Sequence, residues 1–169
     1  MKTAAFAAAG LALGLAVPAG AQGSGAWTLD TPKAPLDVAH LIYAAPGAPA
    51  PLVAVSCRRK TGQVIASFDA AQSLAANRRG ETWVDRIGRP APWPVSVTIA
   101  SGATRTTLRG QASPNPAGGS TVSVEVSDRA PVLAEWKKTG ALQLEALDEA
   151  KAPPPAKKGL VSRFLRFCG

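Results

Sequence analysis

The chain is poor in residues that bind metals. Its 169 residues include one histidine, His40, and only two cysteines, Cys57 and Cys168, which lie far apart in the sequence. Structural zinc sites typically take four Cys or His ligands, and catalytic zinc sites typically take three protein ligands. One histidine and two distant sulfurs do not make such a set, so we predict neither a metal site nor a cofactor.

Residues for acid, base or nucleophilic catalysis are equally scarce. A Ser-His-Asp relay needs its histidine beside a nucleophile and an acid, whereas His40 sits in the apolar stretch 38–42, which is typical of a buried or half-buried structural histidine. No serine occupies a Gly-x-Ser-x-Gly elbow, and Gly118-Gly119 predicts a turn rather than a phosphate-binding loop. Carboxylates are sparse, and nothing marks out a glycosidase pair; the scattered single ones include Asp85, Glu125, Asp128, Glu135 and Glu145. We therefore predict no catalytic residues and a protein that is not an enzyme.

Long apolar runs are absent after residue 17, and the run before it is short. The N-terminus has the three regions of a secretory signal peptide in order. These are the basic Lys2, the apolar stretch 4–17 ended by Pro18, and the small residues Ala19-Gly20-Ala21. The stretch is about 14 residues long, whereas a membrane-spanning helix needs about 20. We expect cleavage after Ala21 and export to the periplasm or out of the cell. Residues 22–169 are then a single domain without a membrane span.

Two cysteines in an exported chain predict a disulfide, because that compartment is oxidising. Free thiols or an intermolecular bridge are the alternatives. Residues 52–57 predict a strand that ends at Cys57, and residues 158–168 predict an amphipathic helix with Cys168 in its apolar face. The simplest arrangement is a C-terminal helix locked to that strand by a Cys57–Cys168 bridge. A membrane-surface anchor is the alternative for this basic helix.

Short segments with alternating apolar residues recur along the chain and predict strands. Residues 69–79 suggest one helical turn, and residues 128–140 predict a short helix capped by Asp128. We expect a β-rich α+β fold, either an antiparallel β-sandwich or an open barrel, with a short helix before the last strand and a disulfide-locked C-terminal helix. The predicted strands are 26–29, 52–57, 63–68, 81–87, 95–99, 104–109, 121–127 and 141–147.

Positive charge is in excess, with 19 Lys and Arg against 11 Asp and Glu. A basic exported protein has a bias towards anionic partners such as phospholipid headgroups, lipopolysaccharide phosphates or acidic polysaccharide, while solubility alone is the commoner reason for such a charge. Nucleic acid is a poor candidate, because the protein is exported and no basic run is long. Four tryptophans indicate packing more than a carbohydrate or peptide groove. The candidate contacts to an anionic partner are Arg58, Arg59, Lys60, Arg163 and Arg166.

The layout of the mature chain resembles the VasI/TagO-like group of small exported accessory proteins of type VI secretion. The pieces that carry the resemblance are 52–57, 63–68, 83–86, 122–126, 131–147 and 161–169, with proline- and alanine-rich loops as the departure. The resemblance implies an envelope protein with a non-enzymatic, assembly-assisting or binding role, and it transfers no catalytic residue. A partner among envelope or secretion proteins is thus the first functional hypothesis. Binding to an anionic envelope surface is the second, and a hydrolase or hydrolase inhibitor is the third.

Overall fold

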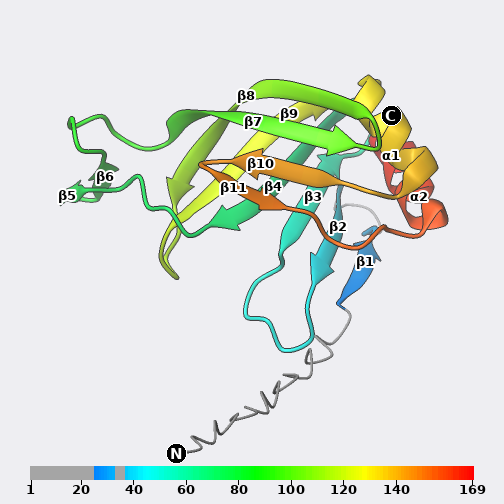
Figure 1. The fold of residues 1–169 in the computed structure, drawn as a ribbon, viewed down its shortest axis with the longest axis horizontal. Helices are drawn as coiled ribbons and strands as arrows, with labels where there is room; N and C mark the ends of the chain where they lie inside the picture. Colours follow the sequence, from blue (N-terminus) through cyan, green and yellow to red (C-terminus); the bar gives the residue numbers. More distant parts are fainter. Residues whose placement is uncertain (1–24, 33–36) are drawn as a thin grey trace, which may run out of the picture.

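Nine antiparallel strands form one strongly curled sheet, a half-barrel, in the computed structural model (Figure 1). The structure describes residues 25–32 and 37–169, so the predicted signal peptide, residues 1–21, lies outside the described residues. The strand order is β1-β2-β3-β4-β9-β8-β7-β10-β11, and β5 and β6 form a separate pair. The strands are β1 (Ala26–Asp30), β2 (Val38–Ala44), β3 (Val53–Arg58), β4 (Gln63–Ala70), β5 (Asn77–Arg79), β6 (Thr82–Val84), β7 (Trp93–Ser101), β8 (Thr104–Pro114), β9 (Ser120–Ser127), β10 (Gln143–Ala146) and β11 (Glu149–Lys151).

The alternation of side chains along each strand decides which face is buried. In β9, Val122, Val124 and Val126 are buried while the residues between them are exposed or half-buried. Successive residues of a strand point to opposite faces, so the curl encloses one apolar face and leaves the other in solvent. The β-rich fold is therefore confirmed, in its open-barrel form.

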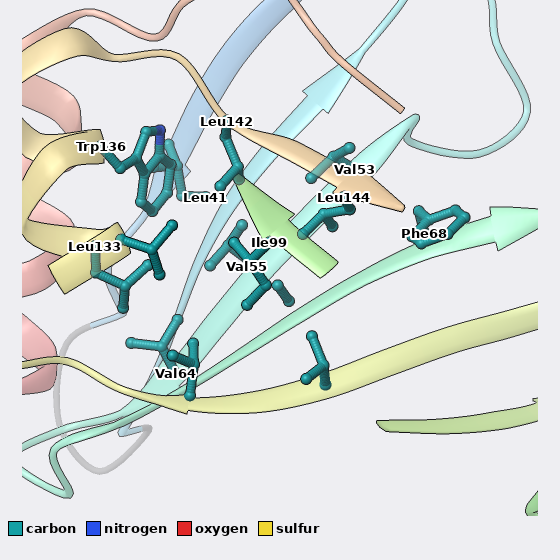
Figure 2. Close-up of a cluster of buried hydrophobic side chains, with 14 of the residues drawn as sticks. Leu41, Val53, Val55, Val64, Phe68, Ile99, Leu133, Trp136, Leu142 and Leu144 are labelled. Atoms are coloured by element: carbon teal, nitrogen blue, oxygen red, sulfur yellow. The ribbon is translucent and has the colours of Figure 1, made fainter. Parts of the chain in front are cut away.

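The core fills the inside of the curl (Figure 2). Leu41, Val53, Val64, Ile99 and Leu144 come from different strands and are fully buried. Two helices add large side chains to the core, chiefly Trp136 and Phe164, at one end of the half-barrel. Burial of an aliphatic or aromatic side chain stabilises the fold by about 1.5–3 kcal/mol, so this shared cluster holds the helices to the sheet.

Both predicted helices are present. Helix α1 (Pro131–Thr139) ends at Gly140, whose φ of 75° suits glycine and whose backbone closely approaches Ala156. Helix α2 (Lys158–Cys168) has the predicted bounds. The predicted cap was wrong: Ala130 precedes α1 without a side-chain hydrogen bond, and Pro131 begins the helix, where its missing N–H costs nothing.

Three other expectations need correction. No helical turn forms in residues 69–79, because β4 continues to Ala70 and the following segment is irregular before β5. The strand expected at 81–87 ends at Val84. Strand β10 is not the last, since it turns at Leu147-Asp148 into β11.

His40 is exposed rather than buried. Its neighbours on β2, Ala39 and Leu41, have no solvent exposure. The alternation of the strand therefore turns the imidazole to the outer face of the sheet.

Residues 71–92, which connect β4 to β7 along the chain, form an arm at the end of the sheet opposite the helices (Figure 1). It contains the β5–β6 hairpin, and residues 89–91 return beside β6 through the Val84–Pro90 bridge and the hydrogen bond from Ala91 N to the Trp83 carbonyl. Glu149 on β11 fixes its start by accepting the backbone N–H groups of Ala71 and Gln72. Its ion pair with Lys151 and these N–H groups lower the pKa of Glu149 despite partial burial.

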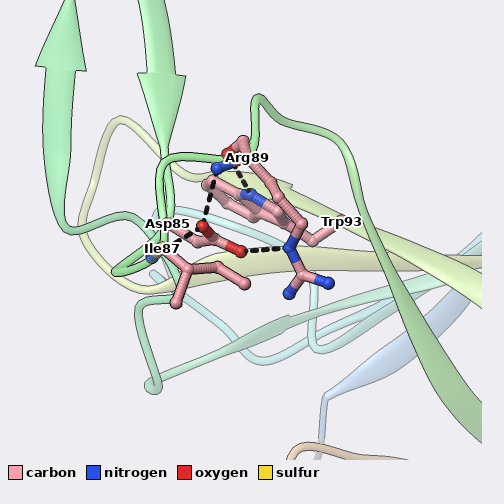
Figure 3. A network of polar contacts seen from close by, with 4 residues as sticks. All are labelled: Asp85, Ile87, Arg89 and Trp93. Atoms are coloured by element: carbon pink, nitrogen blue, oxygen red, sulfur yellow. Dashed lines mark hydrogen bonds and ion pairs between the residues drawn. The ribbon is translucent and has the colours of Figure 1, made fainter.

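A carboxylate organises the turn that follows β6 (Figure 3). Asp85 Oδ1 accepts the backbone N–H groups of Ile87 at 3.0 Å and Arg89 at 2.8 Å, and Oδ2 accepts Arg89 Nε at 2.7 Å. The Arg89 carbonyl in turn accepts the Trp93 indole N–H at 2.9 Å. Burial raises the pKa of Asp85, but the hydrogen bonds from Arg89 and Ile87 outweigh it and lower the pKa below its ordinary 3.8.

Replacing Asp85 with asparagine is expected to loosen this turn in a pH-dependent way. A carboxylate whose pKa is depressed by folding stabilises the folded turn above its unfolded pKa, about 4, and loses that effect as pH falls through the lower folded pKa. Amide exchange at Ile87 and Arg89 should therefore be faster in Asp85→Asn than in wild type at pH 7, and similar in acid below the folded pKa. Glu81→Gln, on the same arm, is the control. An exchange difference that persists in strong acid would contradict the electrostatic explanation.

Candidate functional site

The disulfide predicted from the sequence is present and attaches α2 to the sheet. Cys57 and Cys168 are bonded, with a Cα–Cα distance of 5.6 Å, and both are buried. The turn between β3 and β4 also contacts the end of α2, because Lys60 N donates to the Phe167 carbonyl and Gly62 N donates to the Cys168 carbonyl. The C-terminal helix is thus a fixed part of the domain.

These contacts bring the predicted cationic residues to one end of the molecule. Arg58, Arg59 and Lys60 lie in the turn beside the end of α2, and Arg163 and Arg166 lie on the exposed side of that helix. The Arg59 guanidinium stacks 4.3 Å from the centroid of the Phe167 ring. All five side chains are exposed, and within residues 25–32 and 37–169 none is in an ion pair.

The two helices add further cations to the same end. Asp128 N donates to the Gly62 carbonyl at the start of α1, and Ala156 N donates to the Gly140 carbonyl where α1 ends and α2 approaches. The helices are therefore antiparallel neighbours. The last turn of α1 carries Lys137-Lys138 and the start of α2 carries Lys157-Lys158, so both basic pairs lie near the second junction, and Arg129 lies near the first.

We call residues 58–62, 128–140 and 156–169 the helical end. It carries ten Lys and Arg residues and two acidic residues, Asp128 and Glu135. The other described residues carry seven Lys and Arg against nine Asp and Glu. The entire positive excess of the described chain is thus concentrated at the helical end, although the basic residues look scattered in the sequence.

This concentration exceeds what the helices need for their own stability. Cations near a helix C-terminus are favourable, because the macrodipole places about half a negative charge there. At the C-terminus of α2 this favourable positive charge is supplied by Arg166, Arg59 and Lys60. At the C-terminus of α1 it is supplied by Lys137 and Lys138. Arg129, Lys157 and Lys158 lie near the helix starts, where positive charge is unfavourable, so a structural role does not account for them.

Exposed Lys and Arg groups of this kind bind phosphate and carboxylate oxygens by charge-assisted hydrogen bonds. Their spread over two helices and a turn gives a broad surface rather than a single pocket. Five of the ten Lys and Arg residues of the helical end were identified from the sequence as candidate contacts. The others were visible as basic residues, but their assembly depends on the antiparallel packing of α1 and α2.

Strand register also places a serine, a histidine and an acid in one row on the outer face. Asp30 pairs with His40 across β1 and β2, and His40 pairs with Ser56 across β2 and β3. A working relay has hydrogen bonds from nucleophile to base and from base to acid. No hydrogen bond joins these three described side chains, so the row is an arrangement of neighbours and not an assembled relay.

Three of the four tryptophans are structural. Trp136 has no solvent exposure and Trp93 is 2 % exposed, while Trp27 is half-buried against Tyr43 and Trp136. Their indole N–H groups donate to the carbonyls of Gly140, Arg89 and Pro154 respectively. The predicted packing role holds for these three, whereas Trp83 on the arm is 42 % exposed.

Within the described ranges, no group of three or more His, Cys, Asp and Glu side chains is arranged to hold a metal ion. Neither α1 nor α2, the helices of the described chain, has the length and apolar character to cross a membrane. In comparisons with known proteins, no family model, no curated protein and no solved structure matches this chain.

Proposed function

We propose that this is an exported, non-enzymatic binding protein that attaches through its helical end to an anionic, phosphate-bearing lipid surface. The observation that carries the proposal is the charge distribution, ten cations against two acids at one end of the molecule. The other described residues have a slight negative excess. A molecule with this asymmetry is oriented by the field of an anionic surface, so that it arrives with its helices first.

Two further features support a role in the cell envelope. A buried disulfide fits an oxidising compartment, and the N-terminal sequence has the order of a secretory signal. The resemblance to VasI/TagO-like proteins adds a role in assisting other envelope components. On this view, attachment of the helical end holds the half-barrel where such a component can reach it.

The affinity expected from the helical end is substantial at low ionic strength. Each Lys or Arg near an anionic bilayer contributes about 1 kcal/mol of attraction, which falls off within a Debye length of about 8 Å at physiological salt. Loss of two such residues therefore costs about 2 kcal/mol, or about 30-fold in partitioning.

The test is co-sedimentation of the mature chain with vesicles of zwitterionic lipid, with and without an anionic phospholipid. Binding should require the anionic lipid and should weaken steeply as salt is raised. Arg163→Gln/Arg166→Gln should reduce partitioning about 30-fold. Arg86→Gln/Arg109→Gln removes the same charge from outside the helical end and should change partitioning only slightly.

Two results would overturn the proposal. One is failure of wild type to bind anionic vesicles at low salt. The other is an equal loss of binding in the two double variants, which would show that net charge matters and its location does not. If wild type binds an acidic protein but not anionic vesicles, the lipid proposal is overturned and a protein partner is favoured.

A further inference from the structure

Trp83 on the arm differs from the other tryptophans of the chain. Its indole is 42 % exposed, and its N–H group has no hydrogen-bond partner among the described residues. An exposed indole presents an apolar face and an N–H donor that a ligand can use.

Trp83 borders a hollow of about 470 Å³ between the arm and the β8–β9 turn. This volume lies within the usual range of small-ligand sites. Two hydrogen bonds close the turn: Gly118 N donates to the Asn115 carbonyl, and Ala117 N donates to Asn115 Oδ1. The lining residues are Ser73, Ala75, Trp83, Pro114, Asn115, Pro116, Gly118 and Gly119.

Asn115 and Trp83 line the hollow and present N–H donors to it, and Arg78 lies beside Trp83 without lining the hollow itself. The Asn115 side-chain oxygen is already used within its turn, so its NH₂ group is the part left for a ligand. The Trp83 N–H is a second donor. Arg78 lies directly across the hairpin from Trp83, with its guanidinium 5.8 Å from the indole centroid and in no ion pair with a described residue.

We propose that this hollow is a binding site for an acidic saccharide, separate from the helical end. The indole packs on the apolar C–H face of a pyranose ring, the Trp83 and Asn115 N–H groups donate to ring hydroxyls, and Arg78 pairs with the carboxylate of a hexuronic acid unit. Pro114 and Pro116 complete an apolar wall beside the ring.

The observations favour an acidic saccharide over the two other candidate ligands, an anionic bilayer and an acidic peptide. A bilayer requires an apolar side chain that projects from the protein; Ile87 on the arm is 75 % exposed but borders another hollow beside Asp85 and Arg89, whereas Trp83 borders a concave surface. An extended peptide requires a long free strand edge, whereas the strands of the arm have three residues each. A pyranose ring has an apolar C–H face, hydroxyls and, in a hexuronic acid, a carboxylate, and these groups match one indole, two donors and one guanidinium.

The test uses the mature protein and a short oligomer of a hexuronic acid as the probe, with a neutral hexose oligomer of equal length for comparison. Titration followed by calorimetry and by tryptophan emission should show binding of the acidic oligomer. Trp83→Ala should weaken it about tenfold or more, while Trp83→Phe retains most of it. Arg78→Gln should reduce binding of the acidic oligomer to the level of the neutral one. Ile65→Ala, at an exposed apolar residue on the sheet, is the control and should bind as wild type.

An absence of binding at millimolar probe, or equal binding by wild type and Trp83→Ala, would overturn this inference. Loss of binding in Arg163→Gln/Arg166→Gln would also overturn it, because that result would place the oligomer at the helical end. An acidic peptide or anionic vesicles that compete for Trp83 better than the oligomer would also reject a saccharide ligand. Failure here leaves vesicle binding by the helical end unaffected, because the two sites share no residue.

Discussion

Replacing both Cys57 and Cys168 with alanine is expected to lower the free energy of unfolding by about 4–5 kcal/mol. The bridge joins residues 111 positions apart, so it restricts most of the chain in the unfolded state. In the chain-entropy model a loop of about 100 residues is worth about 4.7 kcal/mol. This is a large share of the stability of an ordinary domain, about 5–15 kcal/mol.

Denaturant unfolding of the oxidised wild type, the reduced wild type and the double variant measures this effect. Both cysteines are buried, so alanine also removes sulfur packing, and the reduced wild type separates that loss from the loss of the cross-link. Amide exchange should rise most in α2, because an isolated helix of 11 residues is marginal in water. Equal stability of oxidised and reduced wild type would contradict the entropic account.

Replacing Trp136 with alanine is expected to destabilise the protein by about 3–5 kcal/mol. Trp136 has no solvent exposure and lies between Trp27 of β1 and Phe164 of α2, with ring centroids at 6.1 and 6.3 Å. Its indole N–H also donates to the Gly140 carbonyl at the end of α1. The substitution therefore opens a cavity at the point where both helices and the sheet edge meet.

Trp83→Ala provides a matched control for this substitution, because the same change is made at a 42 % exposed position. It should cost well under half as much, since surface substitutions usually lie within about 0.5 kcal/mol. Thermal unfolding should separate the variants clearly, because each kcal/mol shifts Tm by several degrees in a domain of this size. Equal Tm losses in Trp136→Ala and Trp83→Ala would contradict the assignment of Trp136 to the core.

The parts of the fold that follow from local pattern were predictable from the sequence. Helix α2 has its predicted bounds because its apolar residues recur at helical spacing. Strand β9 is clear because its valines alternate. The Cys57–Cys168 pairing needed only the inference of an oxidising compartment, since two cysteines allow one intramolecular bond.

The parts that depend on distant contacts were not predictable. Strand β11 follows a turn at Leu147 and Asp148, whose φ values are 53° and 59°. Such turns usually contain Asn or Gly, so a leucine gives no turn signal. The irregular start of the arm depends on Glu149, which binds the N–H groups of residues 71 and 72 from another strand. The charge of the helical end and the hollow beside Trp83 likewise arise from segments far apart in sequence.

The proline-rich segment after β11 affects how this sheet meets other chains. An open sheet has two edge strands, and unpaired N–H and C=O groups at such edges recruit strands from other molecules. Strand β11 has three residues, and Pro153-Pro154-Pro155 follow it without N–H donors. The same segment reaches β1 at the opposite edge, where the Trp27 indole donates to the Pro154 carbonyl at 2.7 Å. A segment that cannot continue a β-ladder thus follows one edge strand and contacts a side chain of the other, which disfavours edge-to-edge pairing at the β11 edge.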